Sequence, residues 1–335
     1  MKKQKKKAAK TLGDWAYLAI KKHLDYTLKY EADVLKDTDP EALHQMRVGM
    51  RRLRTAINGF APALDLPKSA QEQKIAKIGR QLGELRDLDV LQETLQTQIV
   101  LLPTEEQDIL KKVLASIDKQ RQKTLRKVQK TLKSSTYQKL KAAFQNWLEE
   151  PTYGELAELS IYEVLPDLLL PSISQLFLHP AWLVGVKLNA GEIEIPANLD
   201  SEQVRQLLDT HGDSVHSLRK QAKQVRYQME LFTDFYADTY KRYLKDIKEV
   251  QSLLGEIQDS FVLAEFLSEV NADMAKLPIL AAQLTETRYQ VWQKWQSLQQ
   301  RYLNCEVRKD FHASILEPVL PVEEKEQEQT DRKVN

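Results

Sequence analysis

Apolar residues return every three or four positions along most of the chain. The pattern runs from about residue 12 to 150 and again from about 201 to 316, and it predicts amphipathic helices packed on shared cores. Prolines interrupt it at 61–67, at 102–104 and near Pro278. Asp39, Pro40 and Glu41 predict a helix start, and Thr104 with Gln107 matches a capping box at another.

The segment 151–200 has a different pattern, with five prolines and three glycines. It predicts short helices and a loop, with a brief extended piece at 192–195. We therefore divide the chain into a basic arm at 1–10, a first helical bundle at 11–150, a connection at 151–200, a second helical bundle at 201–316 and an acidic tail at 317–335. Both terminal segments are expected to be disordered, because blocks of like charge stay solvated.

Composition narrows the class of protein. With only 10 glycines and 12 prolines in 335 residues, a mostly helical fold is expected. Cys305 is the single cysteine, which excludes a disulfide scaffold. No run of about 18 apolar residues occurs, so we expect no membrane span, and no signal-peptide pattern follows the first lysines, so we expect a cytoplasmic protein.

The most informative feature is an internal similarity. His44, Arg47, Arg51, Arg54 and Phe60 correspond to His216, Arg219, Lys223, Arg226 and Phe232, always 172 residues apart. The segment 82–87 (LGELRD) matches 254–259 (LGEIQD) at the same offset. Two segments with one offset predict two copies of one helical unit and a pseudo-twofold architecture.

The repeated helix has a cationic stripe beside its apolar stripe. At about 100° per residue, His44, Arg47, Arg51 and Arg54 share an arc of about 80°, and so do His216, Arg219, Lys223 and Arg226. No acidic residue occurs from Ala42 through Leu64 or from Ser214 through Met229. Cations one turn apart repel each other, so a bound polyanion is expected to offset the repulsion. Ion pairs with acids from other helices are the alternative.

A third cationic stripe lies at 119–133. Its members fall within about 80° of one another on a helix, and they are Lys119, Lys123, Arg126, Lys130 and Lys133. The pattern fits an additional binding surface and a merely solvated face equally well.

The matching glycine and aspartate positions have simpler explanations. Gly83 and Gly255 are expected to permit close helix contact. Asp87 and Asp259 are expected to orient arginines or cap turns, without a part in chemistry. Arg86, which the second copy replaces with Gln258, is open to either role.

The repeated His-x-x-Arg motifs and the LGELRD segment resemble the CHAD (conserved histidine α-helical domain) family over about residues 11–316. The resemblance implies an all-α fold of two antiparallel four-helix bundles related by a pseudo-twofold axis. It also implies a basic central groove or pore that binds inorganic polyphosphate, and association with polyphosphate granules. Carried over by position, the implied ligands are His44, Arg47, Arg51, Arg52, Arg54, His216, Arg219, Lys220, Lys223 and Arg226, with Arg80 and Lys248 as neighbours on the second helices.

The ligand chemistry agrees with this resemblance. Guanidinium groups bind phosphate oxygens bidentately, and no aromatic stacking platform accompanies the stripes, which makes a nucleic acid a weaker candidate. No Walker loop, Gly-x-Ser-x-Gly or His-Glu-x-x-His occurs, and the Glu192-x-Glu194 pair has proline where a triphosphate-tunnel hydrolase has lysine. We therefore predict a stand-alone polyphosphate-binding protein, not an enzyme, with no catalytic residues, no cofactor and no metal. Phosphate and sulfate are expected to occupy the same groove.

Two other functions remain open at this point. The same stripes could bind RNA or another nucleic acid, or the chain could be an accessory subunit of a polyphosphate-metabolising enzyme or a cryptic phosphatase. The sequence gives no oligomeric state.

Overall fold

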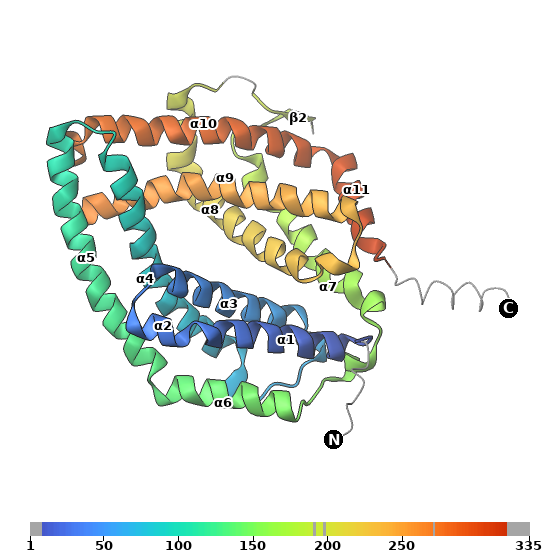
Figure 1. Cartoon of the computed structure of the whole chain (residues 1–335). Helices are drawn as coiled ribbons and strands as arrows, with labels where there is room; N and C mark the ends of the chain where they lie inside the picture. Colours follow the sequence, from blue (N-terminus) through green and yellow to red (C-terminus); the bar gives the residue numbers. More distant parts are fainter. Residues whose placement is uncertain (1–8, 190–191, 197–198, 271, 320–335) are drawn as a thin grey trace. The chain divides into compact units, whose positions relative to one another are not determined.

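The computed structural model describes residues 9–189, 192–196, 199–270 and 272–319. This part of the chain is mostly helical, with one small antiparallel sheet (Figure 1). The predicted disorder of the two terminal segments concerns mainly 1–8 and 320–335, which lie outside the described residues. Contacts divide the chain into two units, Met1–Ser160 with Val262–Ala282 and Ile161–Phe261 with Gln283–Asn335.

Unit 1 contains six complete helices among its described residues. They are α1 (Leu12–Lys29), α2 (Glu31–Lys36), α3 (Pro40–Gly59), α4 (Glu72–Ile99), α5 (Thr104–Leu132) and α6 (Ser135–Glu149). The predicted start of α3 is confirmed, because Asp39 accepts a hydrogen bond from the Glu41 N–H at 2.8 Å and Pro40 takes the first helical position. The capping box at Thr104 is wrong: Pro103 occupies the cap position, and the Gln107 side chain donates to the Leu102 carbonyl instead.

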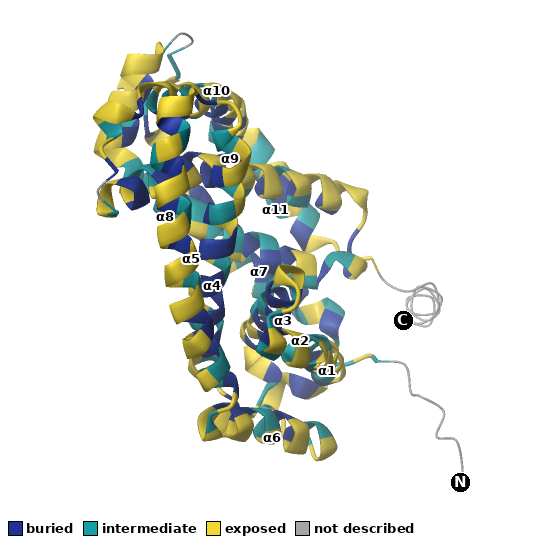
Figure 2. Ribbon diagram, turned by 60° about the vertical axis from the view of Figure 1, so that its left-hand side comes forward, coloured by how far each residue is buried: buried dark blue, intermediate teal, exposed yellow. Residues whose placement is uncertain are grey.

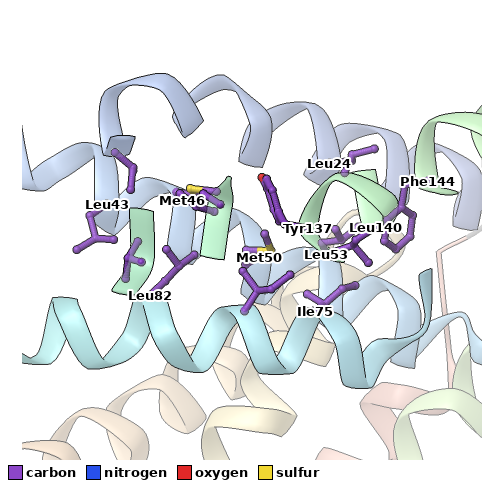
Figure 3. Packing of buried hydrophobic residues seen from close by; sticks show 14 of the residues in the cluster. Leu24, Leu43, Met46, Met50, Leu53, Ile75, Leu82, Tyr137, Leu140 and Phe144 are labelled. Atoms are coloured by element: carbon purple, nitrogen blue, oxygen red, sulfur yellow. The ribbon is translucent and has the colours of Figure 1, made fainter. Parts of the chain in front are cut away.

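The core of unit 1 forms where α3 meets α4, α1 and α6. Met46, Met50 and Leu53 of α3 pack among apolar side chains of the other three helices, all of them almost fully buried (Figure 3). Burying one such side chain contributes about 1.5–3 kcal/mol. The apolar stripe predicted for α3 is therefore confirmed as its core face, which fixes the direction in which the neighbouring cations point.

A buried ion cluster joins α2, α4 and α5. Arg121 of α5 donates two hydrogen bonds to Asp37, at 2.7 and 2.8 Å, and a third to Asp89 of α4 at 2.7 Å. These hydrogen bonds raise the pKa of Arg121, with the bond to Asp37 contributing most. Asp37 ends α2 in the left-handed region, at φ 54°. The cluster ties this strained turn to the long helices.

Unit 2 is built on five helices and the sheet. They are α7 (Ile161–Phe177), β1 (Lys187–Asn189), β2 (Glu192–Glu194), α8 (Ser201–Leu231), α9 (Asp238–Glu269), α10 (Pro278–Leu303) and α11 (Cys305–Leu316), with the end of α9 and the start of α10 belonging to unit 1. Asp200 and Gln203 form a capping box at the start of α8. An aromatic cluster fills the interior, with Phe177 stacked on Tyr302 and in edge contact with Phe311.

The predicted connection 151–200 is more regular than its prolines indicate. The extended piece at 192–195 is confirmed as β2, but α7 is a 17-residue helix with Pro166 and Pro171 inside it. The fully buried side chains at spacings of three and four in α7 outweigh the backbone hydrogen bonds that the prolines remove. These residues are Ile161, Leu165, Leu169, Ile173 and Leu176.

The same segment bears on the expectation about membranes. Within the described residues, one stretch, Ile161–Leu183, is long and apolar enough to cross a membrane by length and composition. A helix packed in a protein core passes the same test, and α7 packs one face on α8 and α11. The expectation of no membrane span therefore stays a prediction.

Candidate functional site

The α3–α4 basic face is the first candidate surface. It comprises His44, Arg47, Arg51 and Arg54 of α3, with Arg80 of α4. The cations of α3 lie beside its core stripe and along the surface of α4. His44, Arg47 and Arg51 are partly buried, whereas Arg54 is exposed. Arg80 is exposed and lies about 20° from Asp87 around α4, which places both on the side that contacts Arg47.

Arg47 lies against the backbone of α4. A Cβ atom added to Gly83 would be 3.3 Å from the Arg47 Nε, 3.6 Å from Nη2 and 3.9 Å from Cζ. One turn further along α4, Asp87 Oδ1 is 3.9 Å from Nη2, and the Asp87 side chain is 73% exposed. This distance is too long for a hydrogen bond, so Asp87 attracts the guanidinium without occupying its donors.

Arg54 of this face also has an acidic neighbour, since it pairs with Glu72 of α4. Arg86, next to the face on α4, lies 3.8 Å from Glu93 on its own helix. The alternative interpretation of the stripe, ion pairs with acids from other helices, therefore describes Arg54, whereas Arg47 has an acid nearby without a hydrogen bond to it. Arg54 is half exposed, so its pair is screened by water and weak.

His44 is held neutral by its surroundings. Burial is the main cause that lowers its pKa, and the charges of Arg86, Arg51 and Arg47 lower it further. Glu41, one turn earlier on α3, acts in the opposite direction. A neutral imidazole surrounded by cations gains a proton readily when an anion arrives.

The α8–α9 basic face is the second candidate surface and repeats this geometry. It comprises His216, Arg219, Lys223 and Arg226 of α8, with Lys248 of α9. A Cβ atom added to Gly255 would be 3.3, 3.7 and 3.9 Å from Nε, Nη2 and Cζ of Arg219. Asp259 Oδ1 is 3.7 Å from Nη2. Lys248 is exposed and lies about 20° from Gly255 around α9, on the same side as Asp259.

The remaining groups of this face are similarly part-buried. Arg226 is 12% exposed, pairs with Glu230 at 3.3 Å and lies over the ring of Tyr227. Burial lowers the pKa of His216, and the charges of Lys220 and Arg219 add to this effect. A hydrogen bond with Gln258 and the charge of Asp213 act in the opposite direction.

Two residues implied by the family resemblance lie to the side of the stripes. Arg52 is about 80° from His44 around α3, and its guanidinium lies 6.0 Å from the ring of Tyr26 on α1. Lys220 is about 40° from His216 and is exposed. Lys220 therefore adds charge next to His216, whereas Arg52 belongs to the α1 side of unit 1.

The α5 basic stripe, defined as Lys119, Lys123, Arg126 and Lys130, has a different setting. All four side chains are exposed. They lie about 180° around α5 from the buried Leu110 and Val128 and from Arg121, which forms the ion cluster with Asp37 and Asp89. Figure 2 shows the contrast between the exposed and buried sides of this helix. Within the described part of the chain, none of the four forms an ion pair.

The expectation for the two glycines is wrong in its detail. Gly83 and Gly255 make room for a guanidinium and not for a neighbouring helix backbone. The sequence signal was present, because the Arg, Gly and Asp positions keep the same spacing in both copies. In the described residues, no group of three His, Cys, Asp or Glu side chains could hold a metal ion.

Comparison with known proteins gives similarities at two levels. Two solved structures share the fold. The CHAD domain from the plant Ricinus communis has a TM-score of 0.56 and 21% identity, and the match covers 96% of this chain and 98% of that one. PptA from Streptomyces chartreusis has a TM-score of 0.62 and 14% identity, and the match covers 87% of this chain and 100% of that one. A search of curated proteins found no match.

The sequence model of the CHAD domain matches residues 18–268, which is more than half of the chain. This range includes both basic faces and the connection between them. The chain therefore belongs to the CHAD domain family, which is associated in general with polyphosphate binding.

Proposed function

We propose that this protein binds inorganic polyphosphate through the α3–α4 and α8–α9 basic faces and has no catalytic activity of its own. Polyphosphate offers a dense row of phosphate oxygens without bases to recognise. Oriented guanidinium groups and lysine point charges are suited to such a ligand.

The observation that carries this proposal is the matched geometry of Arg47 and Arg219. In each unit the Nε–Nη2 edge of the guanidinium faces a glycine, and Nη2 lies 3.7–3.9 Å from an exposed aspartate. The aspartate attracts the group but makes no hydrogen bond to it, so the outer Nη donors, which do not face the glycine, stay available for phosphate oxygens. A structural ion pair would instead be close and bidentate, as Arg121 is with Asp37.

Duplication of one helical unit accounts for this match. Besides the motifs 172 residues apart, α3 and α8 both end at a phenylalanine, with φ and ψ of −104° and 14° at Phe60 and −111° and 14° at Phe232. A short 3₁₀ helix follows each. The pseudo-twofold pair of four-helix bundles and the shared central groove stay predictions of the same proposal, as does a cytoplasmic location on polyphosphate granules.

Competition binding tests the ligand. Long-chain polyphosphate, tRNA and duplex DNA compete for the labelled protein at about 0.15 M salt. All three are sensitive to salt, so the rank order decides: polyphosphate is expected to bind most tightly, and tighter binding of tRNA would reject the proposal in favour of a nucleic acid.

Phosphate release tests the absence of catalysis. The protein is incubated with polyphosphate, with and without divalent cations, and free phosphate is measured. We expect none above the background of a heat-denatured sample. Release that depends on the protein would instead identify a phosphatase.

A further inference from the structure

Glycines in this chain serve two different purposes. At Gly49, an added Cβ would be 2.4 Å from Thr27 Oγ1 and 3.0 Å from its Cα, so this glycine permits close contact between α3 and α1. At Gly83 and Gly255 the three nearest atoms are all guanidinium atoms of one arginine. These two positions therefore accommodate a side chain and not a helix.

The guanidinium orientation is the same in both places. Nε is nearest to the missing Cβ, then Nη2, then Cζ, with distances that agree within 0.1 Å between the two units. In each unit Nη2 also points toward the aspartate four residues after the glycine. The glycine and the aspartate thus define two contacts that fix where the arginine lies on the second helix.

This arrangement has a cost in helix stability. Glycine inside a helix is less favourable than alanine, yet both positions lie in the middle of long helices, α4 and α9. An alanine Cβ would lie 3.3 Å from Nε, so the arginine would have to shift. Orientation of the arginine is the property that glycine preserves.

The geometry points to Gly83 and Gly255 as positioning residues for the polyanion site, which hold Arg47 and Arg219 with their Nε–Nη2 edges against α4 and α9, so that the outer Nη donors receive phosphate. The inference rests on the proposed function. Holding the side chain in place before the ligand arrives reduces the rotamer freedom that it loses on binding.

Alanine substitutions separate this role from packing. Gly83→Ala and Gly255→Ala are compared with Gly79→Ala, a control on α4 where an added Cβ meets nothing within 4 Å. All three are expected to hold or raise the melting temperature, because alanine favours a helix. Only the first two are expected to weaken binding of long-chain polyphosphate, by about threefold each.

A larger side chain and a double-mutant cycle complete the test. Gly83→Leu fills the place of the guanidinium and is expected to lower affinity about tenfold. In an Arg47→Gln background the same change is expected to have no further effect, because the positioned group is gone.

The outcomes distinguish the inference from the function. If wild-type protein fails to bind polyphosphate, both are rejected. If wild type binds and the glycine variants bind equally well, only the positioning role is rejected. A melting temperature that falls in Gly83→Ala but not in Gly79→Ala would identify Gly83 as a packing residue and reject the inference as well.

Discussion

The α3 stripe and the α5 basic stripe look alike in sequence and differ in structure. Both place cations three and four residues apart with no acid between them. On α3 the cations adjoin the core face, lie along α4 and are partly buried. On α5 they lie about 180° from the core face and are exposed.

The difference shows that the angle between the cationic and apolar stripes, and not the number of cations, decides whether a second helix holds the charged side chains. A charge beside the core is held by a second helix, as Arg47 is by Gly83 and Asp87. A charge opposite the core keeps its full hydration and rotamer freedom, both of which a ligand must remove. We therefore expect the α3 stripe to bind a ligand in a fixed orientation and the α5 basic stripe to contribute only general attraction of anions.

The largest expected effect contrasts the two sides of α5 itself. Arg121→Met leaves the buried Asp89 and the partly buried Asp37 without their ionic partner and is expected to lower the free energy of unfolding by about 3 kcal/mol. Lys123→Met, on the exposed side, is expected to change it by less than about 0.5 kcal/mol. Urea titration followed by circular dichroism measures both, and similar values would show that Arg121 is not structural.

The second effect compares the two stripes directly. Arg47→Gln with Arg219→Gln is expected to weaken polyphosphate binding about 100-fold, or about 2.7 kcal/mol. Lys123→Gln with Lys130→Gln removes the same net charge from the α5 basic stripe and is expected to weaken it by about threefold or less. Isothermal titration calorimetry at fixed salt measures both variants. Equal losses would show that total charge, not orientation, governs binding.

Much of this comparison could be predicted from the sequence. Periodicity identified the core face of α3, the cationic stripes and the helix start at Pro40, because these depend on local spacing. The angle between stripes on α5 was also readable from the sequence, yet it became informative only when the burial of Leu110 and Val128 showed which face is the core.

Other features depend on contacts between distant segments. The partners of Arg121 lie 84 and 32 residues away, and Arg54 meets Glu72 across a turn. At Gly83 the missing Cβ makes room for the Arg47 side chain of another helix. A glycine in a helix does not by itself reveal this neighbour, and its usual interpretation is close helix contact. Likewise, α7 keeps Pro166 and Pro171 because its buried stripe packs on α8 and α11, which no local signal reveals.

The smallest expected effect is a pH dependence of binding that the α3–α4 and α8–α9 basic faces have and the α5 basic stripe lacks. His44 faces Glu41, Arg47 and Arg51 of α3 and Arg86 of α4. Its pKa and that of His216 are lowered in the free protein, mainly by burial, so both are neutral near pH 7. A bound polyanion raises these pKa values, and binding takes up protons. The α5 basic stripe has no histidine and no such coupling.

Affinity for polyphosphate is therefore expected to rise about tenfold as the pH falls from about 8 to about 5.5, and to be lost again as the pH rises through the pKa of the bound state. His44→Gln with His216→Gln should give a flat profile in calorimetric titrations at constant ionic strength.

The stability of the free protein should respond to pH in the opposite sense. Because the histidine pKa is lowered in the folded state, the unfolded state binds more protons, and stability falls below about pH 6.5. His23, whose pKa is lowered to about 4 mainly by burial, adds to that loss without contacting either basic face. Acid that tightens the wild-type complex but not that of the double variant would place the titrating groups in the α3–α4 and α8–α9 faces. A wild-type profile as flat as that of the double variant would remove the histidines from the site.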